Sequence, residues 1–413
     1  MNLFKLSIAN LKEKKLNSLL SGLLLTLGIG MISMLLLLNK QLDEQFKKNI
    51  KGIDLVVGAK GSPLQLILSS IYQIDAPTGN IPLEEVNALK ANPFVKTIIP
   101  MSMGDSYMGY RIVGTNAKYI EHFEGKMQQG KVFSESMEVV LGSKVAKNSG
   151  LKIGNSFESS HGLDSDGDKH GDKKFIVTGI LEPSGAVIDQ LVLTSLASVW
   201  DVHDHDKAPA SAHIHEEGEA EHDHHHDEEP EVKKEITSAL VQFRNPMGLL
   251  TIPRHINTNT SMQAALPSIE INRLFSLLGV GMDTLKTLAL IIILIAAASV
   301  FISIYNSLKE RKYEMALMLS LGATRTKLFF MLLFEGTILA ITGFIFGILF
   351  SRVGLWVFAN AAEQDYHYSL GQFQILPEEI YLGLGALLLG LIAAAIPSIG
   401  IYRLNISRTL AED

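Results

Sequence analysis

The sequence predicts an integral membrane protein of the α-helical class, with four spans and a large extracytoplasmic α+β domain between the first and second spans. Its 413 residues are 47% hydrophobic and only 19% charged. Four apolar windows, 18–38, 287–308, 328–350 and 380–402, reach the roughly 20 residues that a membrane helix needs. The segment 39–286 is long enough to fold as a domain of its own.

The charges that flank the spans predict the topology. Four lysines, at positions 5, 12, 14 and 15, precede the first span, and the segment between the second and third spans is basic. Residues 353–379 contain acids but no Lys or Arg, and the C-terminal tail carries Arg403 and Arg408. The positive-inside rule therefore predicts a multi-pass protein of the cell (inner or plasma) membrane, with both termini in the cytoplasm and 39–286 outside.

Residues 1–17 are expected to form an amphipathic helix on the cytoplasmic surface of the bilayer. Leu3, Phe4, Ile8 and Leu11 fall roughly on one side of such a helix. A basic tail that serves only topology is the alternative. We expect 18–38 to be a permanent membrane helix rather than a cleaved signal peptide, because its apolar core is long and no small-x-small site follows it. The chain has no cysteine, which excludes disulfides and thiolate metal sites.

The outer segment, 39–266, has the texture of an α+β domain, built as one body or as two lobes. Residues rich in β-branched and aromatic side chains predict strands at 97–101, 107–114, 138–141, 175–181, 191–194 and 237–243. Helices are expected at 83–91 and at 143–149, the second with Ser143 as its cap and Gly150 at its end. From Pro267, apolar residues recur at helical spacing, which predicts that 267–308 is a stalk helix continuous with the second span.

The segment 309–327, between the second and third spans, is the most informative in the chain. We expect a helix from Glu310 to Ser320 that ends at Gly322 in the left-handed conformation, with Thr324 capping the next helix. Such a rigid hairpin suits docking to a soluble partner, and a basic loop that only sets topology is the alternative. The remaining boundaries are expected at 328–351 and 380–402 for the last two spans, 352–379 for an outer loop, and 403–413 for a cytoplasmic tail.

Three stretches resemble the FtsX/MacB-type permeases, the type VII class of ABC transporters. Residues 310–347 are similar to the most recurrent motif of that family, through Glu310, Arg311, Glu314, Met315, Leu317, Leu321, Gly322, Ala323, Thr324 and Glu335. Residues 125–157 resemble the family's periplasmic core domain. Residues 402–410 resemble its closing R-x-x-P-x-x-x-L motif, with Ile406 in place of the proline.

The resemblance implies a permease subunit that converts ATP hydrolysis by a separate cytoplasmic ABC ATPase into movement of its extracytoplasmic domain. Its coupling residues would be Glu310, Arg311, Glu314, Met315, Leu317, Gly322, Ala323 and Thr324. The chain lacks a G-x-x-x-x-G-K-[ST] loop, so we expect neither a nucleotide site nor enzymatic activity in it. A homodimer in the lipid bilayer is implied, and no nucleic-acid partner is expected. The cargo would be a lipoprotein, peptide or antibiotic; the alternatives are a non-transporting regulator of an extracytoplasmic protein partner and a zinc-linked transport or sensing permease.

Glu335 is the acid that this topology buries within the membrane. Ionisable groups inside a bilayer are costly and are functional candidates by default. Because the family motif places a Glu here whatever the substrate, we expect a role in packing or in a dimer contact. Proton or metal transfer is the alternative.

A His-rich acidic insert, 201–235, is expected to be disordered, and it holds eight of the thirteen histidines. Imidazoles interleaved with carboxylates are suitable ligands for Zn²⁺ and related ions. The candidate ligands are His203, His205, His213, His215, His222, His224, His225 and His226. The alternative is a solvated acidic loop, and zinc as the transported substrate is a narrower version of the metal hypothesis.

Two weaker features complete the set. A second metal site is suggested by His161, Asp164, Asp166, Asp168 and His170. This segment lacks the glycine and the closing glutamate of a calcium loop, so an exposed polar hairpin is the alternative. The apolar run 64–74 is too short to span a membrane, and either contact with lipid or a partner protein or packing in the domain core would explain it.

Overall fold

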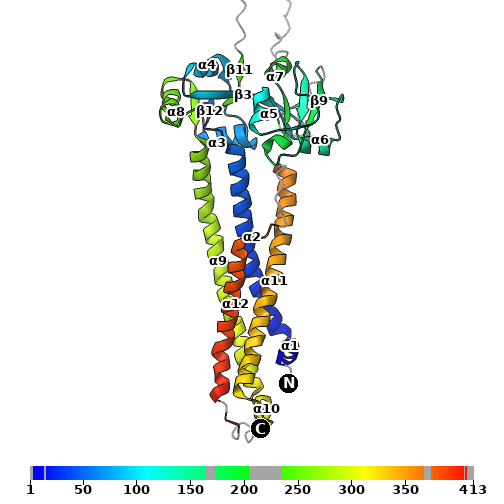
Figure 1. Cartoon of the computed structure of the whole chain (residues 1–413), viewed down its shortest axis with the longest axis vertical. Coiled ribbons are helices and arrows are strands. Elements are labelled where there is room, and N and C mark those ends of the chain that lie inside the picture. Colours follow the sequence, from blue (N-terminus) through cyan, green and yellow to red (C-terminus); the bar gives the residue numbers. More distant parts are fainter. Residues whose placement is uncertain are drawn as a thin grey trace, which may run out of the picture. The chain divides into compact units, whose positions relative to one another are not determined.

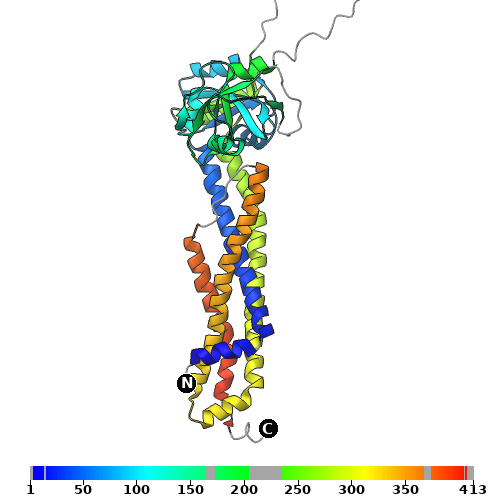
Figure 2. The ribbon, with the colours of Figure 1, turned by 90° about the vertical axis from the view of Figure 1, so that its right-hand side faces the viewer.

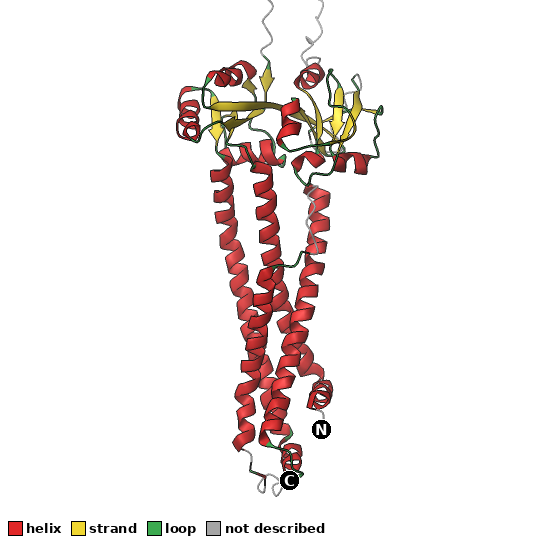
Figure 3. Ribbon diagram, viewed as in Figure 1, coloured by secondary structure: helices red, strands yellow, loops and turns green. Residues whose placement is uncertain are grey.

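The computed structural model describes residues 3–13, 15–162, 173–203, 234–366, 374–403 and 405–406. The chain divides into two compact units. Met1–Glu44 and Ser276–Asp413 form a helical unit, called here the membrane unit, and Gln45–Phe275 form an α+β domain. The strands of the described part all belong to the α+β domain (Figure 3).

Four helices in the described part of the chain are long and apolar enough to cross a membrane. Each contains one of the four windows predicted from the sequence. They are α2 (Lys15–Ile50), α9 (Pro267–Glu310), α11 (Arg325–Tyr366) and α12 (Pro377–Ser398), the last continued by the short 3-10 helix η5 (Ile399–Arg403). Figure 1 shows them as the long helices of the ribbon. Two shorter helices also belong to this unit in the described part of the chain, α1 (Leu3–Glu13) and α10 (Lys312–Ser320).

The outer loop expected from residue 352 is wrong in its first part, because α11 continues as a helix to Tyr366. The physical reason is packing. Leu355 and Ala359 are buried and share a small core with Leu37 of α2 and Leu376. The helix therefore gains buried apolar surface beyond the charged Arg352, at which the apolar window in the sequence stops.

Small residues let α11 and α12 approach closely. Gly336 and Ala340 on α11 face Gly390 and Ala394 on α12, with the same four-residue spacing on both helices. A Cβ added at Gly336 would lie 2.5 Å from the Cβ of Ala394, and one added at Gly390 would lie 2.6 Å from the Cβ of Ala340. This small-xxx-small packing is typical of membrane helix pairs, which associate through van der Waals contact.

The α+β domain is organised around one long strand. The strands of its main sheet follow the order β13-β1-β12-β3-β4-β10-β6-β9-β5, with β7 paired to β9 and β8 to β3. β3 (Val95–Tyr107) pairs with β12 through its first half and with β4 through its second half, so it joins two lobes (Figure 1). The other strands are β1 (Leu55–Ala59), β4 (Tyr110–Thr115), β5 (Met127–Gly130), β6 (Glu138–Leu141), β7 (Ser156–Phe157), β8 (Ser160–His161), β9 (Phe175–Leu181), β10 (Val192–Ser195), β12 (Ser238–Phe243) and β13 (Met262–Ala265). A separate small sheet pairs β2 (Ile81–Pro82) with β11 (Glu235–Ile236).

Helices cover both faces of this sheet, because its strands alternate buried side chains between two cores. On β1, Val56 belongs to the core shared by the two lobes, whereas Leu55 and Val57 pack on the opposite face. The helices are α3 (Pro63–Ile67), the π-helix η1 (Leu68–Tyr72), α4 (Leu83–Ala88), η2 (Leu89–Ala91), α5 (Ala117–His122), α6 (Ser143–Ser149), η3 (Val187–Gln190), α7 (Leu196–His203) and α8 (Met247–Asn259).

Two local predictions in this domain are corrected. The expected strand at 107–114 is interrupted by a tight turn, in which Met108 and Gly109 adopt positive φ values of 51° and 79° and reverse the chain between β3 and β4. The cap of α6 is Gly142, which has no side chain to bond the helix end, and Ser143 is the first helical residue. The helix ends at Gly150, as predicted, and Gly150 adopts the left-handed conformation.

The apolar run at 64–74 packs inside the domain. It forms α3 and η1, and Leu66, Ile67, Ile71 and Tyr72 belong to the core shared by the two lobes. The hydroxyl of Tyr72 donates a hydrogen bond to the backbone oxygen of Phe46 at 3.0 Å. Core packing therefore accounts for the apolar character of this segment.

A carboxylate fixes the turn before β6. Glu138 accepts hydrogen bonds from the backbone N–H groups of Ser134 (2.7 Å) and Glu135 (3.1 Å). These bonds hold the pKa of Glu138 below its ordinary value, and the bond from Ser134 has the largest effect. A folded-state pKa below the unfolded one gives stability that is present above about pH 4.3 and is lost as the pH falls through the folded pKa.

We expect amide hydrogen exchange at residues 134–135, corrected for the intrinsic exchange rate, to accelerate as the pH is lowered. Glu138→Gln should abolish this pH dependence. A corrected rate that does not change with pH in the unmodified protein would contradict the prediction.

Candidate functional site

The segment between α9 and α11 folds into a helical hairpin. α9 ends at Glu310, Arg311 leaves the helical conformation with φ −103° and ψ 22°, and α10 follows directly. Gly322 then adopts φ +95°. The N–H of Gly322 bonds to the backbone oxygen of Leu319, and that of Ala323 to the oxygen of Met318, which is the Schellman pattern of a helix end. The left-handed glycine predicted from the sequence is therefore present, although Glu310 belongs to α9 and not to α10.

The next helix begins as predicted. The side chain of Thr324 accepts a hydrogen bond from the N–H of Lys327 at 3.3 Å, so it caps α11. Arg325, the first residue of α11, donates to the backbone oxygen of Tyr402. The ring of Phe329 lies 6.0 Å from that of Tyr402, between centroids. The hairpin is thus tied to the end of η5 as well as to its own two helices.

One face of α10 is buried and the opposite face is exposed. Met315 and Ala316 are fully buried, and Met315 belongs to the core of the membrane unit. Tyr313, Leu317 and Leu321, spaced four residues apart, are 44%, 44% and 79% exposed. Residues at this spacing lie along one side of a helix. We call these three residues the α10 ridge.

The predicted coupling residues therefore divide into two kinds. Leu317 is exposed on the ridge, and Glu310, Gly322 and Thr324 are also exposed. Met315 is buried and holds α10 in place, so it cannot contact a partner directly. Sequence reasoning did not include Tyr313 among the candidates, although its four-residue spacing from Leu317 could have indicated it.

Arg311 and Glu314 pair with each other. The Nε of Arg311 donates to Glu314 at 2.7 Å, and the Arg311 side chain is only 12% exposed. This ion pair spans the break between α9 and α10. The pair braces the angle between α9 and α10, so Arg311 and Glu314 have a structural role.

Glu335 faces α1. It is 3% exposed, and the Nδ2 of Asn10, which is 7% exposed, donates to its Oε1 at 2.6 Å. The hydroxyl of Ser7, one helical turn earlier, donates to the backbone oxygen of Met331 at 2.9 Å. Figure 2 shows α1, the short dark-blue helix beside the N-terminus, lying across the long helices of the membrane unit. Glu335 therefore anchors the N-terminal helix to α11 within one chain.

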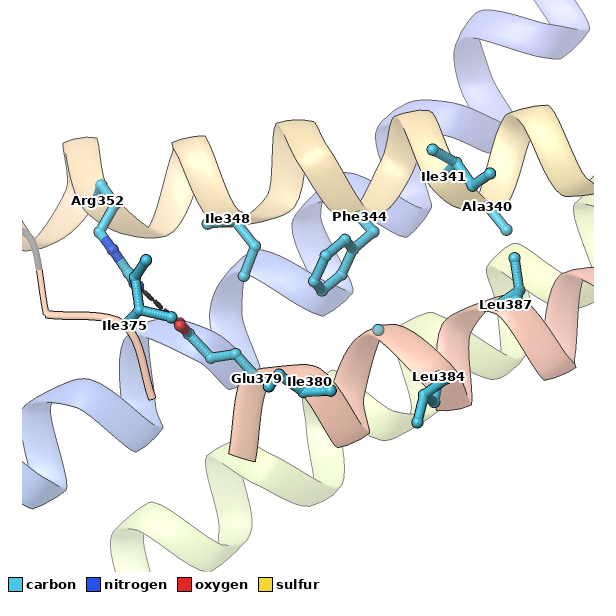
Figure 4. Close-up of a pocket in the computed structure, with 11 residues that line it drawn as sticks. Ala340, Ile341, Phe344, Ile348, Arg352, Ile375, Glu379, Ile380, Leu384 and Leu387 are labelled. Carbon is cyan, nitrogen blue, oxygen red and sulfur yellow. Dashed lines mark hydrogen bonds and ion pairs between the residues drawn. The ribbon is translucent and has the colours of Figure 1, made fainter. Parts of the chain in front are cut away.

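A second buried acid forms a polar network that sequence reasoning missed. The side chains of Arg352 on α11 and Glu379 on α12 are 11% and 4% exposed and form a two-pronged ion pair, with both N–O distances within 2.9 Å (Figure 4). Ser33 of α2 donates to Glu379 at 2.6 Å. The network connects three of the four spans. Both charged residues had been placed in the outer loop, because each lies at the edge of an apolar window.

Residues 286–406, which contain the hairpin, match the family described as FtsX-like permease C-terminal. Residues 18–215 match the family described as MacB-like periplasmic core domain. The chain belongs to the FtsX/MacB-type ABC transporter permeases. The permease is accordingly a multi-pass membrane protein with an extracytoplasmic domain.

Two solved structures resemble part of the permease. One is the periplasmic region of MacB from Actinobacillus actinomycetemcomitans, at 12% identity and a TM-score of 0.34, covering 55% of this chain and 97% of that one. Another is the extracellular domain of the noncanonic ABC-type transporter YknZ from Gram-positive bacteria, at 13% identity and a TM-score of 0.30, covering 51% of this chain and 98% of that one. A search of curated proteins found no match.

The candidate metal ligands lie almost wholly outside the described residues of the permease. His203 and His161 are described only as backbone positions, at the end of α7 and in β8. The other histidines of the insert, and Asp164, Asp166, Asp168 and His170, fall within 163–172 or 204–233, which the structure does not describe. No group of three or more His, Asp or Glu suited to a metal occurs among the residues that are described. Zinc binding by the insert stays a prediction.

Gly322 offers a test of the hairpin. A Cβ added there meets no atom within 4 Å, so the cost of Gly322→Ala is the backbone cost of a positive φ, about 1–2 kcal/mol. Gly281→Ala is a matched control, because Gly281 is equally uncrowded but lies inside α9, where alanine is the better helix former by about 0.5–1 kcal/mol. Thermal unfolding of the full chain in detergent should show shifts of opposite sign. Shifts of the same sign would contradict the strained turn.

Proposed function

We propose that the permease transmits ATP hydrolysis by a separate ABC ATPase subunit to its extracytoplasmic domain, through the hairpin formed by α10. The observation that carries this proposal is the exposed α10 ridge, Tyr313, Leu317 and Leu321. Neighbouring exposed apolar side chains that are held in place mark a site of protein contact. Membership of the family supports an ATPase as the partner.

Charge supports placing this hairpin in the cytoplasm. The segment around α10 carries Lys309, Lys312 and Lys327 in addition to the paired Arg311. Such basic segments remain on the cytoplasmic side of a membrane. The ridge would then lie in water, where a soluble ATPase can reach it, and both termini would be cytoplasmic.

The hairpin is built to transmit force and not to yield. Met315 and Ala316 fix α10 to the membrane unit, and the Arg311–Glu314 pair braces its junction with α9. α9 is one unbroken helix of 44 residues that begins directly after β13, the last strand of the α+β domain. At 1.5 Å per residue it is a rod about 66 Å long. Movement of the ridge would therefore reach the α+β domain along a continuous covalent helix.

We further propose that two copies work together. ABC motors have paired nucleotide sites, and each chain offers one hairpin. The apolar windows of α9 and α2 are the least buried of the four, at 28% and 33%, so they are the faces most suited to a second copy. Closing the two stalks would expel or extract a substrate, for which the family favours a lipoprotein, a peptide or an antibiotic.

The test is capture of the ATPase by the full-length permease in detergent. Leu317→Asp places a charge in the middle of the ridge, and we expect it to weaken capture by more than about tenfold, as for a central contact residue. Lys312→Gln is the matched control, because it changes the net charge by the same single unit on the same helix but lies off the ridge. Glu314 is avoided because its loss would also break the pair with Arg311. Undiminished capture by Leu317→Asp, with normal membrane insertion, would refute the proposal.

A further inference from the structure

An apolar groove of about 560 Å³ lies between α11 and α12 (Figure 4). Both helices are membrane spans, so the medium around this groove is lipid. Its volume falls within the range of about 300–1,000 Å³ that is usual for small-molecule sites. Its apolar lining includes Ile341, Phe344, Ile348, Ile380, Leu384 and Leu387.

Gly383 lets the ring of Phe344 lie against α12, and the chain's own side chains leave the rest of the groove unfilled. A Cβ at Gly383 would lie 2.9 Å from Cζ of Phe344, so only glycine allows the ring to lie against α12. The groove walls stay uncovered, since Ile341 is 45% exposed and Leu384 is 59% exposed. Hydrocarbon is the ligand that such walls accept without a desolvation cost.

One end of the groove is polar, and its charges balance. Arg352 and Glu379 line this end and neutralise each other through the ion pair described above. Within the described residues, the hydrogen bonds of Arg352 use its Nη1 and Nη2 atoms, for Glu379, two serines and the oxygen of Gln374. Arginine has a further N–H donor at Nε. Arg352 follows the apolar window 328–350 and Glu379 precedes the window 380–402, so this end of the groove lies at the edge of the bilayer, where lipid headgroups are found. An apolar groove with a polar end at this level matches an amphiphile.

We propose that this groove binds one acyl chain of a membrane phospholipid, with an ester or phosphate oxygen of the lipid accepting a hydrogen bond from Arg352. A second copy of the chain is the other candidate occupant. It fits α2 and α9 better, because their apolar windows are 33% and 28% buried, compared with 44% for α11 and 39% for α12. The inference does not depend on the proposed coupling to an ATPase.

The experiment is native mass spectrometry of the full-length chain in detergent, titrated with palmitoyl-oleoyl-phosphatidylglycerol. Leu384→Trp fills the groove from α12, and Ile341→Trp fills it from α11. If one of these variants fails to fold, the other still tests the groove. Ile392→Trp is the control, because Ile392 is 48% exposed on α12 but lies about 12 Å further along the helix and does not line the groove. Gel filtration checks that each variant is monodisperse.

We expect one retained lipid per chain, about tenfold or more weaker retention in either groove-filling variant, and unchanged retention in Ile392→Trp. Equal retention in all four proteins would overturn the proposal. So would a loss of dimer in Leu384→Trp and Ile341→Trp with lipid retention unchanged, because that result would assign the groove to a second copy.

Discussion

Arg352→Met is expected to destabilise the membrane unit by about 3–5 kcal/mol, the usual cost of leaving one partner of a buried ion pair alone. The Glu379 side chain is 4% exposed and receives both prongs of the guanidinium. Ser33 and the N–H of Leu376 would still donate to it, but no cation would balance its charge. The expected result is a marked loss of resistance to denaturant for the full chain in detergent.

A double-mutant cycle separates the interaction energy of the ion pair from the contributions of the two individual residues. Arg352→Met with Glu379→Gln removes both charges, so it should recover much of the stability that the single change loses. Arg273→Met is the control for deleting an arginine, since Arg273 is exposed in the α+β domain. If Arg352→Met is no worse than Arg273→Met, the pair does not hold the spans together.

This pair also shows where the sequence stops being informative. Arg352 follows one apolar window and Glu379 precedes the next, so each residue alone predicts the edge of the bilayer. Their partnership joins positions 27 residues apart, and nothing in the local pattern of either helix indicates it. The same edge effect explains why α11 was expected to end at 351, although Leu355 and Ala359 pack beyond Arg352.

The spans and the hairpin could be predicted because their signals are local. A membrane helix needs a run of apolar residues, and the turn at Gly322 needs a residue that tolerates φ +95°. The sheet of the α+β domain could not be predicted in the same way. β1 pairs with β12 and β13, which follow it by most of the length of the domain, and β13 (Met262–Ala265) has no residue with a strong preference for strands.

For the functional candidates too, local sequence signals could be predicted and contacts between distant residues could not. Leu317 could be recognised from the motif, but burial separates it from Met315, which is two residues away and holds the helix in place. The direction of a side chain on a short helix depends on what that helix packs against, and α10 packs against a core assembled from helices distant in sequence. Glu335 could be singled out as an intramembrane acid, but its partner Asn10 lies 325 residues away.

Asn10→Leu is the second change with a large expected effect. It removes the hydrogen bond from Nδ2 to the buried carboxyl group of Glu335, and taking a partner from a buried acceptor costs about 1–3 kcal/mol. We expect α1 to detach from α11 more often, which would appear as faster amide exchange across 3–13 in the full-length chain. Ala9→Leu, at an exposed position on the same helix, should leave that exchange unchanged.

Glu335→Gln distinguishes an anchor from a proton carrier. Glutamine retains a carbonyl oxygen that can accept the hydrogen bond from Asn10, but it cannot release or take up a proton at pH 7. If Glu335 acts by holding α1, this variant should keep slow exchange across 3–13 and most of the ATPase stimulation in a reconstituted complex. Slow exchange with abolished stimulation would instead show that the charge itself is needed. Asn10→Leu removes the contact and keeps the carboxyl group, whereas Glu335→Gln keeps the contact and removes the carboxyl group. The two variants together therefore distinguish an anchoring role from a role of the charge.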